Sequence, residues 1–249
     1  CKDYLESSDP SEMFIGEPCA IEVSQRIKFI KSPSQNALLI TANKEMSLGI
    51  FMNALAKACQ QKQEEQFFLL NGSQGDPQAQ KYFDLLEGKI KTFLPGKADE
   101  LIENLHQTLS ARQENNQGTA IYVFAADLQR FRKLQKKEDF SWDETEKSNA
   151  DKLEELIQQG PEHNIHFVIH CDSFSSYQRI LSNKLLQDFD IRLLSQMSQT
   201  DSLACIDKSE ASKLELHTAL LYQDHNGLIK KFRPYALPSL AFYKGQMRS

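Results

Sequence analysis

The stretch Asn-Ala-Leu-Leu-Ile-Thr-Ala-Asn-Lys-Glu-Met-Ser-Leu-Gly, at positions 36–49, decides the fold that this sequence predicts. Residues 37–42 form an almost continuous apolar run, which is typical of a strand covered on both faces of a sheet. From Leu48 onward, apolar side chains recur at helical spacing as far as about Gln63. The stretch therefore predicts a buried strand, a tight connection and the start of a helix.

This βα unit recurs along the chain, and strands that alternate with helices predict a mainly parallel sheet. The Asn226-Gly227 pair between two apolar runs predicts an antiparallel hairpin near the C-terminus. A loosely alternating run at 21–30, which Pro33 ends, predicts an edge strand. The other expected strands are 66–70, 89–93, 119–126, 165–171, 191–194, 219–222 and 228–232, and further helices are expected around 79–87, 101–109 and 149–159.

The composition is that of an α/β domain with a large core. Five scattered cysteines without a C-x-x-C pair argue against a zinc site or a disulfide framework. No apolar run reaches the roughly 20 residues of a membrane helix. We expect residues 1–13 to be an acidic linker or tail and residues 14–249 to be one domain of a longer, cytoplasmic protein, without membrane contact from this segment. The net charge of −5 predicts weak DNA binding at most.

The connection after the first buried strand can be compared with a phosphate-binding loop. Such a loop reads G-x-x-x-x-G-K-[ST], with glycines for close backbone approach and a lysine for the phosphates. Over residues 42–49, Ala42 and Ser47 take the glycine positions, Leu48 the lysine position and Gly49 the hydroxyl position, with Asn43 and Lys44 between them. The sequence therefore predicts the frame of a phosphate site without its chemistry. No cofactor is expected, although backbone amides leave weak binding of ATP with magnesium open.

Several further motifs occur in an order that resembles one family. Phe-Ile-Gly-Glu-Pro at 14–18 resembles the opening motif of FtsK/SpoIIIE-type modules, and the strand at 164–169 is similar to their Gly-Ile-His strand. The segments at 190–193, 196–198, 201–202 and 206–207 look like the family's C-terminal motifs. The resemblance implies a RecA-like, three-layer P-loop NTPase fold of the HerA–FtsK group, mainly parallel with an antiparallel hairpin.

The departures from this family concern its catalytic positions. The resemblance places the carboxylate pair that supports magnesium and water at Ala126 and Asp127, so at best one carboxylate is kept. It places Asp172 where the family has a glutamine that senses the γ-phosphate, and a negative side chain repels phosphate. We therefore expect the fold without the activity, as in the degenerate members of tandem ATPase modules in type VII secretion motors.

Three hypotheses for the function follow. The first is a non-hydrolysing module, the terminal unit of a longer motor, that serves assembly, regulation or substrate docking beside neighbouring ATPase domains. The second is an active ATP-dependent DNA translocase domain. The third is a module that binds a protein substrate, with an apolar pocket in place of the phosphate site.

Charged and aromatic candidates outside the loop remain open between function and structure. Four cationic side chains are candidate contacts with phosphate or with another subunit, or else a solvated face: Arg130, Arg132, Lys133 and Arg192. The histidines at 163, 166 and 170 do not align with a fourth ligand, so ordinary strand histidines are favoured over a metal site. Trp142, in an acidic stretch, is a candidate partner anchor.

Overall fold

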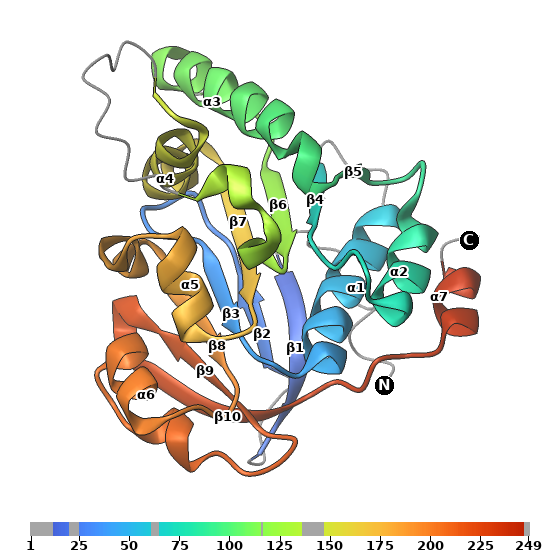
Figure 1. The fold of residues 1–249 in the computed structure, drawn as a ribbon, viewed down its shortest axis with the longest axis vertical. Coiled ribbons are helices and arrows are strands. Elements are labelled where there is room, and N and C mark those ends of the chain that lie inside the picture. Colours follow the sequence, from blue (N-terminus) through green and yellow to red (C-terminus); the bar gives the residue numbers. More distant parts are fainter. Residues whose placement is uncertain (1–11, 20–24, 61–64, 116, 136–146, 247–249) are drawn as a thin grey trace.

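The fold is built around one twisted sheet in the part of the chain that the computed structural model describes, residues 12–19, 25–60, 65–115, 117–135 and 147–246 (Figure 1). The sheet has ten strands in the order β2-β1-β10-β9-β8-β3-β7-β6-β4-β5. The strands are β1 (Glu12–Pro18), β2 (Gln25–Lys28), β3 (Ala37–Ile40), β4 (Gln66–Asn71), β5 (Lys91–Phe93), β6 (Ile121–Ala126), β7 (Ile165–Cys171), β8 (Ile191–Leu194), β9 (Ala219–Gln223) and β10 (Leu228–Pro234).

The strands from β5 to β8 in this order run parallel, and β9, β10, β1 and β2 add antiparallel neighbours. Every residue of β3, β6, β7 and β8 is buried, as expected for parallel strands with both faces covered. The turn between β9 and β10 ends at Gly227, whose φ of +64° is the left-handed conformation that glycine favours. The predicted parallel sheet with an antiparallel hairpin near the C-terminus is confirmed.

Helices cover both faces of the sheet and complete three layers (Figure 1). Leu38 and Ile40 of β3 point toward α3, α4, α5 and α6, whereas Ala37 and Leu39 point toward α1 and α2. The helices are α1 (Lys44–Gln60), α2 (Pro77–Phe83), α3 (Ala98–Asn115), α4 (Asn149–Gln159), α5 (Phe174–Ile180), α6 (Gln199–Ile206) and α7 (Leu240–Gln246).

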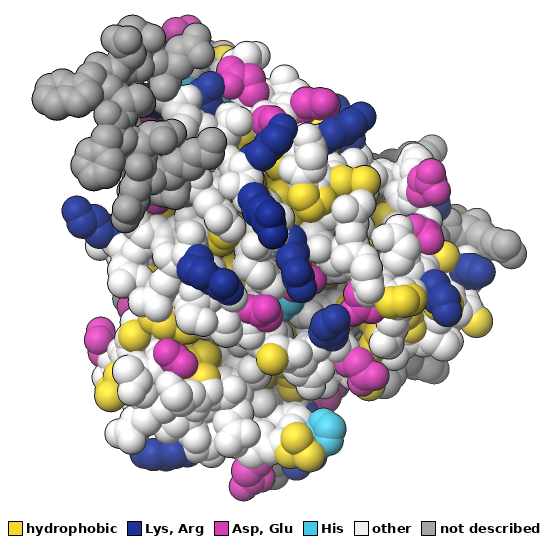
Figure 2. All heavy atoms as spheres, viewed as in Figure 1, with side chains coloured by type: hydrophobic (Ala, Val, Ile, Leu, Met, Phe, Trp, Pro, Cys, Tyr) yellow, Lys and Arg dark blue, Asp and Glu magenta, His cyan; other side chains and the backbone are white. Residues whose placement is uncertain are grey.

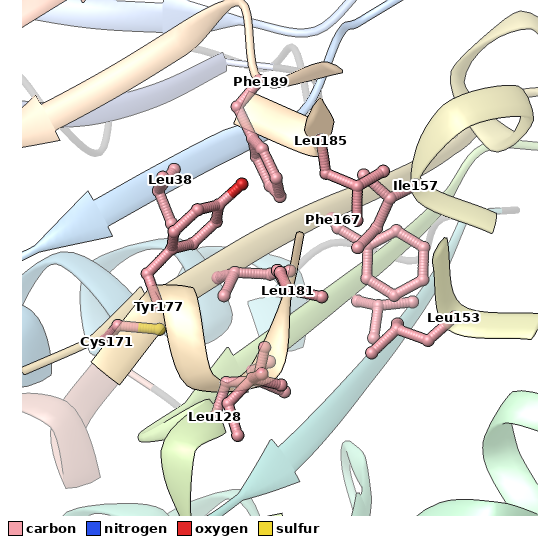
Figure 3. Packing of buried hydrophobic residues seen from close by; sticks show 14 of the residues in the cluster. Leu38, Leu128, Leu153, Ile157, Phe167, Cys171, Tyr177, Leu181, Leu185 and Phe189 are labelled. Atoms are coloured by element: carbon pink, nitrogen blue, oxygen red, sulfur yellow. The ribbon is translucent and has the colours of Figure 1, made fainter. Parts of the chain in front are cut away.

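The core between the sheet and the helices α4 and α5 is closely packed. Figure 3 shows Phe167 of β7 against Leu153 and Ile157 of α4, with Tyr177 of α5 on the other side of the cluster. Tyr177 and Phe189 meet edge to face, with ring centroids 6.3 Å apart. This packing fixes the strand ends at which the candidate site lies.

Three boundaries differ from the sequence expectations. β1 begins at Glu12, and Met13 is buried, so the sheet starts two residues before the expected domain start. The expected edge strand at 21–30 is β2, which the structure describes as Gln25–Lys28 at the end of the sheet. The expected strand at 89–93 begins only at Lys91. In the described residues, none of the helices is long and apolar enough to cross a membrane.

Candidate functional site

The connection between β3 and α1 is shorter than a phosphate loop. β3 ends at Ile40 and α1 begins at Lys44, so only residues 41–43 lie between them. Ser47, Leu48 and Gly49 lie inside α1 and are buried. Residues 44–49, over which the eight-residue pattern was laid, are thus helical, and the connection itself has only three residues.

Asn43 closes the N-terminus of α1. Its Oδ1 accepts the backbone N–H of Met46 at 3.1 Å, and its carbonyl oxygen accepts that of Ser47 at 3.1 Å. Its own N–H donates to Oγ1 of Thr41 at 3.0 Å. The bond to Met46 is an N-cap bond, and it occupies one of the backbone donors that a bound phosphate would otherwise use.

Gly49 packs against the chain that follows β10. A Cβ at this position would lie 3.4 Å from the carbonyl oxygen of Tyr235. The same C-terminal segment is held by the Tyr82 hydroxyl, which donates to the carbonyl oxygen of Pro238 at 2.8 Å, and by the Tyr243 hydroxyl, which donates to Oδ1 of Asn53 at 2.5 Å. Gly49 therefore serves helix packing at the position where the motif has its hydroxyl residue.

Asp127 lies at the end of β6 in a closed hydrogen-bond network. Its Oδ2 accepts from Oγ of Ser73 at 2.7 Å, and its Oδ1 accepts from Nε2 of Gln129 at 3.1 Å. Its backbone N–H donates to Nδ1 of His170 at 3.3 Å, and Nε2 of His170 donates to the carbonyl oxygen of Thr41 at 3.0 Å. The network thus joins the ends of β3, β4, β6 and β7.

These bonds assign the neutral form to His170, with its proton on Nε2. Burial lowers the pKa of His170, and the nearby Asp127 carboxylate and the carbonyl of Thr41 only partly oppose that shift. A neutral imidazole therefore occupies the space beside Asp127, whereas Ala126, the other position of the expected carboxylate pair, offers only a methyl group.

Lys44 forms an ion pair with Asp76 across the same site, with Nζ and Oδ2 2.9 Å apart. Oδ1 of Asp76 also caps α2 through the N–H groups of Gln78 and Ala79. The hydrogen bond from Lys44 lowers the pKa of Asp76, and the same bond raises the pKa of Lys44. Because Lys44 is mostly exposed, this pair contributes little to stability.

The space that these groups enclose is small. Lys44, Ser73, Asp76, Asp127 and His170 line a cavity of about 20 Å³, which is room for roughly one water molecule. Small-ligand pockets measure roughly 300 to 1,000 Å³. The cavity between these side chains is therefore much smaller than a typical small-ligand pocket.

The remaining candidates fall in different places. Asp172 follows β7 and is exposed. Burial of part of its carboxyl group favours a higher pKa, but hydrogen bonds from Ser176 and Ser173 outweigh this effect and lower the pKa of Asp172.

Arg192 is buried. Its guanidinium donates to the carbonyl oxygens of Phe189, Leu186 and Cys205 and to the carboxylate of Asp224. The structure thus gives Arg192 a role in packing, away from the surface.

The basic residues after β6 lie on the surface. Arg130 and Arg132 are exposed, and Nζ of Lys133 pairs with Oδ2 of Asp99 at 2.6 Å. Figure 2 shows a row of Lys and Arg side chains down the middle of the viewed face. The acidic stretch with Trp142 lies outside the described residues, so the partner-anchor hypothesis stays a prediction.

His166 of β7 is held inside the core. Nδ1 of His166 donates to the carbonyl oxygen of Gln35 at 2.8 Å, and its ring stacks on Tyr122. Burial lowers the pKa of His166 to about 4. The described residues contain no group of three or more His, Cys, Asp or Glu side chains placed to hold a metal ion.

Sequence reasoning missed Asn43 as a cap and the pairing of Ser73, Asp127 and His170. An asparagine directly before the Lys-Glu start of a helix is a recognisable cap signal. Asp76 before Pro77 is a second one, since proline favours the first position of a helix. By contrast, the pairing of Asp127 with His170 joins two strands and has no local sequence signal.

No family model and no curated protein matches the chain. Solved structures do match. The pCW3 conjugation coupling protein TcpA, in a monomer form with ATPγS, superposes with a TM-score of 0.73 at 12% identity over 100% of this chain and 73% of its own. The structure of ATPases 2 and 3 of EccC from Thermomonospora curvata, in complex with a signal sequence peptide, superposes with a TM-score of 0.61. The two chains are 12% identical, and the match covers 96% of this chain and 46% of the EccC chain. The chain has the fold of an FtsK-type P-loop ATPase module.

Solved structures with lower TM-scores also share this fold. The genome packaging NTPase B204 of Sulfolobus turreted icosahedral virus 2, in complex with sulfate, gives a TM-score of 0.52 at 10% identity over 83% of this chain and 98% of its own. The chain spans less than half of the solved EccC and EssC structures. At such identities the likeness concerns the fold, and the site must be judged from its own residues.

Proposed function

We propose that this FtsK-type module does not hydrolyse ATP and acts in assembly, regulation or substrate docking within a longer, cytoplasmic motor protein. The observation that carries the proposal is the N-terminus of α1, where Asn43 caps the helix directly and leaves no loop to surround a phosphate. The network of Asp127 with His170 and Ser73, and the small cavity beside it, support the same conclusion.

The expected partners are neighbouring ATPase modules of the same longer protein. EccC and EssC, whose modules share this fold, are solved as pairs of ATPases in one chain, and the larger EccC and EssC structures are cytoplasmic domains. In such a series of modules, an inactive module contributes to assembly, regulation or substrate docking through the contacts that its surface makes without bound nucleotide.

The test measures ATP binding and magnesium-dependent hydrolysis by the chain. We expect no turnover, and a rate above roughly 1 per second, a typical lower value for enzymes, would contradict the proposal. Leu48→Lys is expected to restore no activity, because Ala126 still leaves the carboxylate pair incomplete.

A second variant tests whether Lys44 replaces the missing motif lysine. If it does, Lys44→Ala weakens ATP binding, whereas the matched control Lys97→Ala, at another exposed position, does not. We expect neither variant to change ATP affinity, because the Lys44 ammonium already pairs with Asp76.

A second candidate function is DNA translocation, which the exposed Arg130 and Arg132 favour. Among the described residues, neither side chain forms an ion pair, so both are available to a phosphate backbone. The absence of a phosphate loop at α1 argues against a motor activity of this module by itself.

A further inference from the structure

A groove of about 570 Å³ lies beside the N-terminus of α1. It is on the side of the helix opposite the small cavity that Lys44, Asp127 and His170 line. Its walls come from the start of α1, the loop after β8, the turn before β9 and the chain that follows β10. Met46 and Leu237 contribute apolar surface to it. This volume lies within the range of natural binding pockets, and the groove is open to solvent.

A tight turn at the rim presents a leucine to solvent. Both the backbone N–H and Oγ1 of Thr218 donate to the carbonyl oxygen of Glu215, at 3.1 and 2.6 Å, and His217 adopts a φ of +62°. Leu216, between them, is 81% exposed, more than any other large apolar side chain in the described residues. A partner that covered this side chain would gain the free energy of removing its apolar surface from water.

The charges around the groove have both signs. Glu45 and Glu215 are exposed on its lining, and so are Arg233 and His217. Within the described part of the chain, Glu45, Glu215 and Arg233 form no ion pair. A surface with one sign of charge would repel its own copy, but a surface that carries both signs can pair acid with base across a two-fold axis.

We propose that this groove is an interface between two copies of this chain. Leu216 of each copy inserts into the groove of the other, and Glu215 of each copy faces Arg233 of its partner. The two-fold arrangement uses the same surface twice, so one leucine and one groove suffice for two buried contacts. The proposal is independent of nucleotide binding, because the groove and the small cavity beside Asp127 lie on different sides of α1.

The test is sedimentation equilibrium of the chain over about 1 to 200 μM, the range of a moderate interface. We expect a monomer–dimer equilibrium that Leu216→Glu weakens by about tenfold or more, as for a central apolar anchor. The matched control is Leu203→Glu, on α6, since Leu203 is also exposed, at 44%. Thermal unfolding shows whether both variants keep the fold.

Charge reversal tests the pairing. Glu215→Arg and Arg233→Glu each weaken dimerisation, and the two together restore it, because acid and base then exchange places across the axis. A chain that stays monomeric at every concentration overturns the proposal. A dimer that is insensitive to Leu216→Glu, or a double variant no better than the singles, overturns it as well.

Discussion

Nδ1 of His170 accepts the backbone N–H of Asp127 at 3.3 Å, so a histidine of β7 holds the residue that ends β6. The resemblance to FtsK-type modules implies that Asp127 falls at the strand end where active relatives hold a carboxylate pair. Here the carboxylate accepts hydrogen bonds from Ser73 and Gln129 instead. In this chain the carboxylate at this position is thus held by hydrogen bonds within the protein.

His170→Ala is expected to lower the free energy of unfolding by about 2 to 4 kcal/mol, because the variant leaves a cavity and unpairs the carbonyl oxygen of Thr41 and the N–H of Asp127. Urea denaturation measures the change. The control is His163→Ala, since Nδ1 of His163 has no hydrogen-bond partner in the described residues. Equal losses from both variants would contradict the role of the network.

Two glycines near the site are expected to respond in opposite ways to alanine. Gly49→Ala raises stability by about 0.5 to 1 kcal/mol, because alanine favours a helix and the new Cβ lies at an ordinary 3.4 Å from Tyr235. Gly72→Ala lowers it by about 2 kcal/mol or more, because its Cβ would lie 2.5 Å from the carbonyl oxygen of Asp127. Thermal unfolding of the two variants checks both signs. A destabilised Gly49→Ala would show that this position needs glycine for another reason.

The fold was accessible from the sequence because its strongest signals are local. β3 and β6 are apolar runs of four and six residues that are buried throughout, and such runs predict strands covered on both faces. The turn that ends at Gly227 also has a local signal. Each of these elements could be placed without knowledge of its neighbours.

The site was less accessible because it depends on contacts between distant segments. The motif overlay assumed a loop after β3, whereas the Asn43 cap and the absence of glycine between residues 41 and 48 let α1 begin at Lys44. Asp127 and His170 are 43 residues apart in sequence. Arg192 is a charged residue that only the structure places in the core, where carbonyl oxygens surround it.

His166 is expected to make stability depend on pH. Its pKa is about 4 in the folded protein and 6.5 as a free side chain. Because the unfolded chain binds the proton more tightly, the contribution of neutral His166 is complete above pH 6.5 and is lost as the pH falls toward 4. His166→Gln removes this dependence.

The measurement compares unfolding free energies of the wild-type chain and His166→Gln between pH 7 and pH 4. Carboxylates titrate in both proteins, so their contributions cancel in the difference. We expect the wild type to lose on the order of 3 kcal/mol more than the variant over this range. Parallel curves would show that His166 is charged or hydrated in the folded protein.

The last prediction concerns the exposed arginines after β6. Arg130 and Arg132 offer two cations to a phosphate backbone, but the net charge of −5 works against binding. We expect weak duplex DNA binding that falls steeply with salt, since each neutralised phosphate releases counterions. Fluorescence anisotropy at several salt concentrations measures this binding.

The double variant Arg130→Ala with Arg132→Ala should reduce the slope of log affinity against log salt concentration by about two, one unit for each phosphate contact. Lys208→Ala with Lys213→Ala, which changes the net charge equally from −5 to −7, is the control and should leave the slope unchanged. Submicromolar affinity at physiological salt that is lost only in the arginine variant would favour the translocase hypothesis over a non-hydrolysing module.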